Sequence, residues 1–467
     1  MTKPLSFHFF MMATPSHHFH GGWRHPESRS IAYNKLETWI ELAKLAERGK
    51  VDTIFIADVF GMYEGQGGNS DLIVKNAIHF PVGDPAVILS AMAAVTSNLG
   101  FIYTNSILQQ HPFTFARQMS TLDHLTEGRV GWNIVTTASK NGSRSMGLDT
   151  LTDHDERYRW ADEYTEVVYK LWEGSWEDDA VLRDTVNGIY ADPAKVHRIN
   201  HVGKRYSVEG PHLIEPSPQR TPVLFQAGTS SAGQAFAARN AEGVFIMSGS
   251  PQRTAEYITQ IKSVATAAGR HENDIQFLEG LSFIVGSTEE EARRKEAEID
   301  GWMNFEAEAA MRSAATGLDL TKYDPDTPLV ELLDKAHGMR SVLQLAIDAA
   351  PPGETATVKH MLLETQRLLR VVGTPESIAD RLEEYQRAGI NGVNLIYSLL
   401  PGSFADFVDH VAPVLQKRGL MKEDYLPGTL REKLSPGRGP RLNDRHPATQ
   451  YRHGAALSPA KELDPAT

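Results

Sequence analysis

The chain has 467 residues, of which 41% are hydrophobic and 23% charged, a composition typical of globular proteins. Its 47 Lys and Arg residues are outnumbered by 59 Asp and Glu residues. The net charge of −12 therefore argues against nucleic acid or an anionic membrane surface as a partner. Cys is absent, which excludes disulfides, thiolate metal sites and a Cys nucleophile, and we expect a reducing, cytoplasmic location. We expect neither a signal peptide nor a membrane span.

Short apolar runs alternate with longer amphipathic segments along the chain. The runs that predict strands are 5–12, 52–58, 99–106, 130–135, 221–228, 243–248, 275–286 and 392–398. The segments that predict helices are 33–49, 84–98, 112–126, 231–241, 251–268, 375–389 and 403–418. About eight strand–helix units predict an α/β fold with a parallel sheet covered by helices. A closed (β/α)₈ TIM barrel is the leading interpretation, and an open doubly wound sheet is the alternative.

Three regions do not follow this repeat. Residues 138–220 come after the fourth predicted strand and contain a helix at about 155–173 and a hairpin near 189–209. Residues 287–372 come after the seventh strand and contain two or three helices. We therefore predict one barrel domain over 1–419 with two insertions. An extended, Pro-, Arg- and Gly-rich tail follows over 420–467, and it either wraps a neighbouring subunit or is partly disordered.

The predicted strand ends carry mostly neutral hydrogen-bonding side chains. In a TIM barrel the active site lies at the C-terminal ends of the strands. The residues expected there are Asp58, Thr104, Asn105, Asn133, Thr136, Thr137, Gln226, Ala227, Gly228, Ser248, Tyr397 and Ser398. Such a set suits a large, mostly uncharged ligand, and it suits a hydrolytic metal centre badly because that needs converging His and carboxylate ligands.

Two segments suggest where the charged end of a ligand would lie. AGTSSAG (227–233) places a flexible turn and three hydroxyls before a helix, and a helix N-terminus with hydroxyls is a ready anion site. An N-cap cluster without any ligand is the alternative there. His154 and Tyr158 are four residues apart and share one helix face. They either reach a phosphate or a ring edge, or they simply pack the insertion.

The segment HHFHGGWRHP (17–26) has the composition of a metal site but lacks its spacing. No HExxH motif and no suitably spaced carboxylate accompanies these histidines, so we predict no metal site. A loop over the barrel mouth is the better interpretation, with His17 or His20 facing a substrate.

Several longer motifs identify a family. GRVGWNIVTT (128–137), HDERYRWADEYTEVVYKLWEGSWEDDA (154–180), KVHRINHVGKRY (195–206) and PSPQRTPVLFQAGTSSAG (216–233) resemble the nitrilotriacetate/dibenzothiophene-sulfone/dimethyl-sulfide/long-chain-alkane monooxygenases. These enzymes belong to the bacterial luciferase-like superfamily, and the resemblance extends to about residue 455. It implies a (β/α)₈ barrel that uses reduced FMN and O₂. A separate NAD(P)H-dependent flavin reductase would supply the FMNH₂. O₂ would add at the flavin C4a atom to give the peroxide that oxygenates the substrate.

The resemblance also assigns roles to individual residues. Asp58, Thr104, Asn133, Thr136 and Thr137 match contacts to the flavin ring and ribityl chain. His154 and Tyr158 match groups near the flavin, with Tyr158 on the phosphate side, and Ala227, Gly228, Thr229 and Ser230 match the phosphate loop. His17, Tyr63 and His79 lie on loops after the first two strands. We expect them on the substrate side, where a His can transfer protons near neutral pH.

The substrate is not identified by the resemblance. Ala138 stands where several relatives have a polar residue or His, and Thr14 stands where one subgroup has Cys. Apolar loop residues such as Phe10, Met11 and Phe19 favour a substrate with apolar surface. Arg24 and Arg144 are the evident cations near the mouth, which disfavours the polyanion nitrilotriacetate. Organosulfur compounds, alkanes and amines remain as substrate types.

Three other functions are compatible with parts of this pattern. A deazaflavin-dependent dehydrogenase would transfer hydride without oxygen, and a non-catalytic flavin-binding protein would hold oxidised flavin tightly. A barrel metallohydrolase would lose activity on chelation. Homodimers and homotetramers are common in the family, so the resemblance implies a homo-oligomer. We expect no nucleic acid or membrane partner.

Overall fold

Eight parallel strands close into a barrel in the computed structural model. It describes residues 3–453 apart from 65–69, 138, 150, 229, 317, 336–342, 345, 348–349 and 351–352. The strand order is β10-β9-β4-β3-β2-β1-β13-β11, and β10 also pairs with β11. The barrel strands are β1 (Ser6–Met12), β2 (Thr53–Ala57), β3 (Gly100–Ser106), β4 (Val130–Val135), β9 (Val223–Gln226), β10 (Gly243–Ile246), β11 (Gln276–Val285) and β13 (Gly392–Ile396). This closure confirms the predicted TIM barrel and excludes the open sheet.

Alternate side chains of each strand divide between two apolar cores. In β4, Trp132 and Ile134 belong to the core between strands and helices, and the Trp132 ring centroid lies 4.6 Å from that of Phe115. The barrel interior is filled by four phenylalanine rings and aliphatic side chains, with the Phe10 centroid 4.7 Å from Phe245 and 5.3 Å from Phe55. The side-chain period of two along a strand produces this division and directs Asn133 toward the barrel axis.

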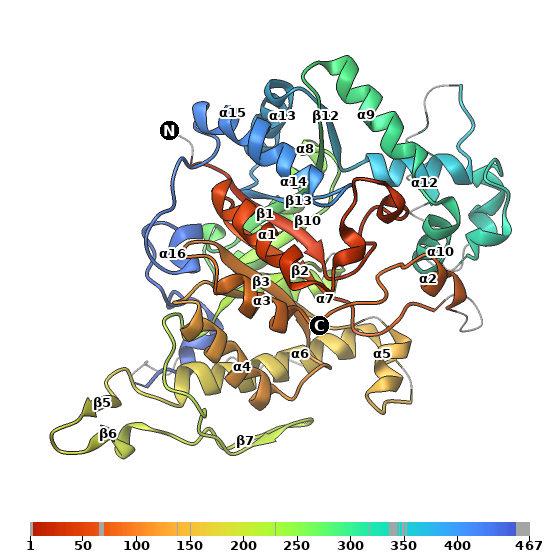
Figure 1. Cartoon of the computed structure of the whole chain (residues 1–467). Helices are drawn as coiled ribbons and strands as arrows, with labels where there is room; N and C mark the ends of the chain where they lie inside the picture. Colours follow the sequence, from red (N-terminus) through yellow and green to blue (C-terminus); the bar gives the residue numbers. More distant parts are fainter. Residues whose placement is uncertain are drawn as a thin grey trace.

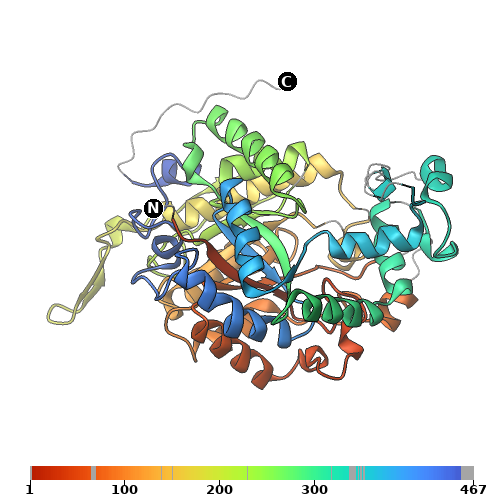
Figure 2. The same cartoon turned by 90° about the horizontal axis from the view of Figure 1, so that it is seen from above.

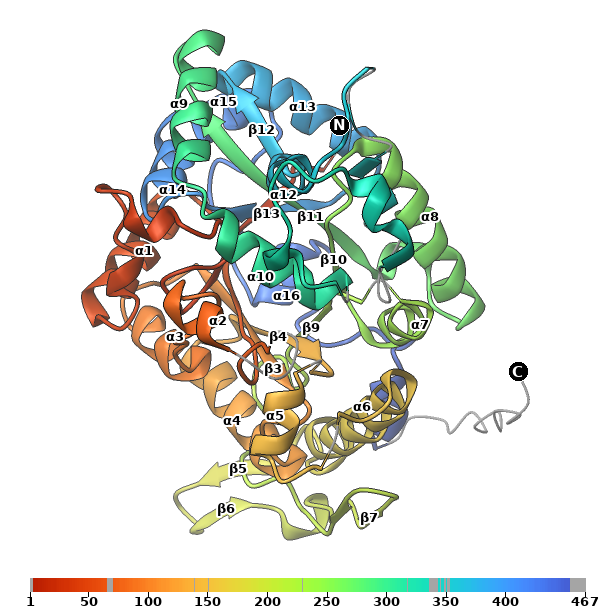
Figure 3. The same ribbon diagram turned by 90° about the vertical axis from the view of Figure 1, so that its right-hand side faces the viewer.

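Helices surround the strands, as Figure 3 shows in a view toward the barrel mouth. They are α1 (Leu36–Arg48), α3 (Pro85–Ala93), α4 (Pro112–Leu125), α6 (His154–Tyr169), α7 (Ser231–Asn240), α8 (Pro251–Ala267), α13 (Pro375–Arg387) and the run α14 (Gly402–Asp406), η9 (Phe407–Val411), α15 (Ala412–Lys417). The predicted start of the second helix is confirmed, because the Asp84 side chain accepts from the backbone N–H of Ala86 at 2.8 Å.

The first insertion follows β4 and contains α5 (Lys140–Ser145), α6 and the π-helical turn η4 (Lys170–Gly174). The hairpin predicted near 189–209 is present but shorter, over 201–208, and a second antiparallel pair that was not predicted precedes it. The two pairs are β5 (Val181–Asp184) with β6 (Ile189–Ala191), and β7 (His201–Val202) with β8 (Ser207–Val208). Asp184 causes the first turn, since its carboxylate accepts the backbone N–H groups of Val186 and Asn187, both at 2.9 Å.

The second insertion lies at the C-terminal end of the barrel, over its mouth (Figures 1 and 3). Its helices are α9 (Glu289–Gly301), α10 (Phe305–Thr316) and α12 (Val358–Arg367), and it has a small apolar core that includes Leu320, Leu329 and Leu332. A further strand, β12 (Arg370–Gly373), was not predicted. It pairs in parallel with the last part of β11, from Ser282 to Val285, and so extends the sheet beyond the barrel.

The C-terminal tail packs against its own barrel as far as it is described. Helix α16 (Leu430–Leu434) lies at the end opposite α10, and Leu430 and Leu434 join the apolar core of the barrel interior (Figure 1). Residues 420–453 of the tail therefore close the end of the barrel opposite the mouth, and α16 is called here the plug helix. Figure 2 shows the strands β5 and β6 of the first insertion and the helices of the second insertion on opposite sides of the molecule. No helix in the described part of the chain is long and apolar enough to cross a bilayer.

Candidate active site

The C-terminal strand ends and the first insertion surround a cavity of about 270 Å³, called here the strand-end cavity. It is lined by Asp58, Val59, Phe60, Tyr63, Ile134, Val135, Thr136, Thr137, Ser139, Tyr158, Gln226, Ala227 and Gly228. Six of the eleven residues predicted to contact a flavin are among them. Thr229 lies outside the described residues, and the other four lie immediately beside this lining.

Asn133 and Thr104 form one edge of the site, next to the lining residue Ile134. The Asn133 amide nitrogen donates to the Thr104 hydroxyl at 2.9 Å. Its amide oxygen is buried and has no hydrogen-bond partner in the protein. A buried acceptor without a partner is costly, so this atom is suited to a donor on a bound ligand. Thr137 adopts a left-handed backbone (φ 52°), and its hydroxyl bonds that of Ser106.

Asp58 is the one ionisable carboxyl in the lining. Gln109 donates to it at 2.7 Å. Burial raises the pKa of Asp58 to about 6, despite this hydrogen bond and one from the Val59 backbone. Sequence reasoning missed Gln109, which lies in the segment after β3 and reaches the site only through the closed barrel. Its position as a polar residue just beyond the end of β3 could have indicated it.

The opposite end of the cavity is formed where α6 and α7 begin. Ser230 caps α7, accepting from the Gly233 backbone N–H at 3.1 Å, and its hydroxyl lies 3.2 Å from His154 Nε2. The Tyr158 hydroxyl accepts from Gln226 at 3.4 Å, and burial raises its pKa, so the phenol is neutral. The N-terminus of α7, neutral hydroxyls and an imidazole make this end suited to an anion, whereas the N-terminus of α6 is already capped by the Asp153 carboxylate.

Gly228 gives the loop its shape. A Cβ atom on Gly228 would lie 2.8 Å from the Gly233 Cα and 2.5 Å from the Gln226 side chain, so a larger residue would displace the turn. Tyr257 holds the loop from the other side by donating to the Gly228 carbonyl at 2.8 Å. Sequence reasoning missed Tyr257 because it lies in the middle of α8, away from any strand end.

Buried imidazoles lie beside the strand-end cavity and include both predicted catalytic histidines. The His79 ring is 5.5 Å from Tyr63, a lining residue, and 5.5 Å from His17, while His17 is 4.2 Å from His18. His79 Nε2 donates to the His17 carbonyl at 2.9 Å, and Nδ1 of both His17 and His79 has no partner in the protein. The structure thus brings His17, Tyr63 and His79 together.

The protonation of these imidazoles differs from the expected behaviour. Burial lowers the pKa of His18, His20 and His79 to about 3, and that of His17 well below its usual value. Neighbouring imidazoles add to the effect except at His20, where Arg312 does so. They are therefore neutral around pH 7 and act there as hydrogen-bonding groups.

A second cavity of about 200 Å³, the insertion cavity, lies on the far side of His18. It is lined by His18, Phe19, Met247, Ser282, Arg312, Gln366, Leu368, Leu369, Arg370, Ile396, Tyr397 and Ser398. The buried Glu308 links the histidine segment to the lining of this cavity. It accepts from the His20 backbone at 3.2 Å and from Gln366 at 3.0 Å, and burial raises its pKa to about 7.

The two cations inferred from the sequence line neither cavity. Arg24 is exposed and donates to the Trp302 carbonyl, and Arg144 pairs with Glu64. Instead Arg312 and Arg370 line the insertion cavity, the second of them paired with Asp300. No spacing pattern indicates either arginine, because both lie in the second insertion and reach the mouth only by tertiary packing.

The fold and this arrangement define a TIM-barrel enzyme with a deep ligand site at its strand ends. A sequence profile described as luciferase-like monooxygenase matches residues 9–392. The chain is 44% identical to dimethyl-sulfide monooxygenase of Hyphomicrobium sulfonivorans over 97% of this chain and 94% of that one. It is 43% identical to long-chain alkane monooxygenase of Geobacillus thermodenitrificans, covering 97% and 99% of the two chains.

Solved structures agree with these sequence relationships. The crystal structure of DmoA from Hyphomicrobium sulfonivorans superposes with a TM-score of 0.90, at 42% identity, over 99% of this chain and 100% of that one. A riboflavin lyase structure with modified FMN and riboflavin gives a TM-score of 0.86 at 37% identity, over 96% and 100%. The chain belongs to the luciferase-like monooxygenase family, and it is a flavin-dependent monooxygenase.

Proposed function

We propose that the protein is the oxygenase component of a two-component system. A separate NAD(P)H-dependent flavin reductase would supply FMNH₂. With O₂ as co-substrate, the protein would insert one oxygen atom into a small organic substrate. The observation that carries the proposal is the strand-end cavity, in which a mostly uncharged lining leads to one anion-suited end at the starts of α6 and α7. FMN has this chemistry, since it joins an uncharged ring and ribityl chain to one phosphate. The bound flavin would supply the oxygen chemistry through a C4a-peroxide.

The chain's own residues would bind and orient the flavin. Ser230, His154 and Tyr158 would hold the phosphate together with backbone N–H groups at the start of α7. The unpartnered Asn133 amide oxygen would accept from the flavin ring, with Thr104 fixing the amide's orientation. Thr136 and Thr137 would contact the ribityl chain, and Asp58 would accept from the ring edge or a ribityl hydroxyl.

The substrate would lie on the histidine side, between the flavin and the insertion cavity. Phe19, Leu369 and Ile396 offer an apolar wall there, while Ser282, Gln366 and Tyr397 offer hydrogen bonds. Neutral His17 and His79 would donate and accept hydrogen bonds near the reacting atoms and exclude bulk water. Organosulfur, alkane and amine substrates fit such a lining. With two arginines beside it, a substrate with an acidic group is no longer disfavoured.

The proposal is tested by mixing protein preloaded with FMNH₂ with oxygenated buffer in a stopped-flow spectrometer. A long-lived absorbance band before the return of oxidised FMN supports the oxygenase. Candidate substrates that accelerate its decay and gain an oxygen atom would then define the substrate class. Reoxidation at the rate of free flavin, unchanged across sulfides, sulfones, alkanes and amines, would instead favour the non-catalytic flavin-binding alternative. Hydride transfer to a deazaflavin without O₂ would favour the dehydrogenase.

A further inference from the structure

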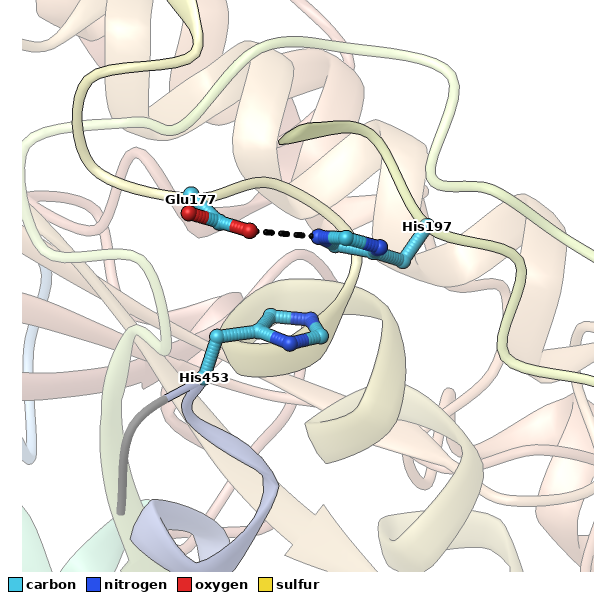
Figure 4. A group of neighbouring side chains, drawn as sticks. All are labelled: Glu177, His197 and His453. Atoms are coloured by element: carbon cyan, nitrogen blue, oxygen red, sulfur yellow. Dashed lines mark hydrogen bonds and ion pairs between the residues drawn. The ribbon is translucent and has the colours of Figure 1, made fainter. Parts of the chain in front are cut away.

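Three side chains with metal-ligating atoms lie together where the first insertion meets the C-terminal tail (Figure 4). They are Glu177, His197 and His453, and one ligand atom of each lies within 4.8 Å of the other two. It is the one group of this kind found in the described part of the chain, and none of the three lines either cavity. We propose that this group binds a divalent transition metal ion, Zn²⁺ foremost, and that the ion fastens the tail to the insertion.

The backbone presents two of the ligands on one face. Trp176 and Val196 form an antiparallel bridge, the Glu177 N–H donates to the Lys195 carbonyl at 3.0 Å, and the His197 N–H donates to the Ser175 carbonyl at 2.7 Å. Glu177 and His197 are therefore diagonal neighbours on the same side of this ladder. Their side chains already meet, with Glu177 Oε1 2.8 Å from His197 Nε2. This is a hydrogen-bond distance, and an ion bound by both atoms would replace the hydrogen bond and move the two atoms slightly apart.

The tail brings the third ligand to the same place. Arg452 donates to the buried carboxylate of Glu173 at 2.6 Å and to the Leu442 carbonyl at 3.0 Å, which fixes the chain next to His453. The His453 Nε2 donates to the Gly174 carbonyl, so its Nδ1 carries the lone pair. Metal-ligating histidines commonly donate their other ring N–H to a carbonyl in this way. The His453 ring lies 3.9 Å from that of His197, centroid to centroid.

The ligand types select the ion. Two imidazoles and one carboxylate are the protein ligands of several zinc centres, which complete their coordination with water. Ca²⁺ and Mg²⁺ prefer oxygen ligands alone. The side chains of Glu177 and His197 are 32% and 31% exposed, so an ion can enter from solvent. The neighbouring cation Lys195 is paired with Asp179 and does not bring an uncompensated positive charge.

The proposal departs from the sequence-based expectation of no metal site. Glu177 and His197 are 20 residues apart, and His453 comes from the tail, so no local motif announces the group. The competing arrangement is a Glu177–His197 ion pair with His453 merely stacked on it. If the competing arrangement is right, replacing His453 should not change the affinity for a metal ion; if the metal site is right, it should.

The test uses the full-length protein, stripped with EDTA, dialysed and titrated with Zn²⁺ by calorimetry and with Co²⁺ by visible absorbance. We expect one ion per chain. His453→Ala and Glu177→Gln should each weaken binding by at least about 100-fold, since even outer-shell partners contribute about 10- to 100-fold. His410→Ala is the matched control, because His410 is exposed on η9, away from the group, and should bind as the wild type does. Zn²⁺ should also raise the melting temperature of the wild type and not that of His453→Ala.

Far-UV circular dichroism and FMN binding establish that each variant is folded. Binding of Zn²⁺ by His453→Ala with wild-type affinity and stoichiometry would overturn the proposal. So would a wild-type protein that takes up no Zn²⁺ or Co²⁺, and the group would then be an ion pair with a stacked ring.

Discussion

At the scale of single residues, Tyr158 is the clearest test of where the phosphate lies. Its hydroxyl sits between Gln226 and the turn at Gly233, and its loss in Tyr158→Phe would remove one neutral donor to an anion. A hydrogen bond to a charged group contributes about 1.5–3 kcal/mol, so the FMN dissociation constant should rise about 10- to 100-fold. Fluorescence titration of FMN measures this. Tyr190→Phe, on β6 beside Glu215, should leave the constant unchanged.

Asp58 makes the stability of the flavin-free protein depend on pH. Its pKa in the folded state is raised by burial from 3.8 to about 6. Its contribution to stability is therefore fully present below about pH 4 and is lost as the pH rises through 6. The loss is at most about 3 kcal/mol, since each pKa unit corresponds to about 1.4 kcal/mol. Urea unfolding between pH 4 and 7 should show this decline in the wild type and a smaller one in Asp58→Asn, which keeps a partner for Gln109. Parallel curves for the two proteins would contradict the assignment.

The residues that sequence reasoning found and missed differ in one physical respect. Asp58, Thr136 and Gly228 follow directly from strand ends, which the closure of a parallel barrel must bring together. Gln109 reaches the site through the course of a loop, and Tyr257 through the packing of a helix. The periodicity of apolar residues predicts neither. The flavin assignment itself came from the resemblance of longer motifs.

At the scale of elements, alternation of apolar runs was enough to predict the barrel. Each predicted barrel strand is present within a few residues, because buried parallel strands must be almost continuously apolar. β12 was missed because Arg370–Gly373 is short and only partly buried, and its pairing with β11 depends on the path of the second insertion. The plug helix α16 was missed because the Pro- and Gly-rich tail around it contains little periodic signal.

α16 is predicted to stabilise the whole barrel through one buried ion pair. Arg431 donates to Glu242 at 2.7 and 2.9 Å and to the Thr221 carbonyl at 2.8 Å, and this guanidinium lowers the pKa of the buried Glu242 despite burial. Arg431→Met would leave a buried carboxylate uncompensated, which costs about 3–5 kcal/mol. Urea unfolding should show this loss. Arg431→Met combined with Glu242→Gln should recover part of it, and a failure to recover any would mean that helix packing dominates.

The insertion cavity is predicted to bind the substrate's far end. Met247 lines this cavity yet remains 46% exposed, so Met247→Trp should narrow the cavity without disturbing the core. Once a substrate is known, its KM should rise about tenfold or more, as expected when about 1.4 kcal/mol of binding is lost. The FMN dissociation constant should stay the same. A wild-type KM for every substrate would place the substrate elsewhere.

At the scale of the whole molecule, the two cavities meet at the buried histidines, which separate the expected flavin site from the space under the second insertion. The imidazole of His79 spans from Tyr63 on the strand-end side to His17 and His20. An oxygenase must keep water and stray protons from its activated oxygen, or the oxygen leaves as hydrogen peroxide. A neutral, close-packed group of imidazoles is suited to this, because it fills the space without bringing a charged acid.

His79→Ala should therefore uncouple the reaction. The truncated side chain leaves a polar void that water can enter, since Nδ1 of His17 already lacks a partner there. We expect the hydrogen peroxide released per O₂ consumed to rise several-fold, while FMN affinity stays near the wild-type value because His79 does not line the strand-end cavity. An oxygen electrode with a peroxidase-coupled assay measures the ratio, and His410→Ala is the surface control. If His79→Ala weakened FMN binding as much as Tyr158→Phe and left the peroxide ratio unchanged, His79 would belong to the flavin site. A return of coupling in His79→Gln, which refills the void with a neutral hydrogen-bonding group, would confirm that exclusion of water is what the imidazole provides.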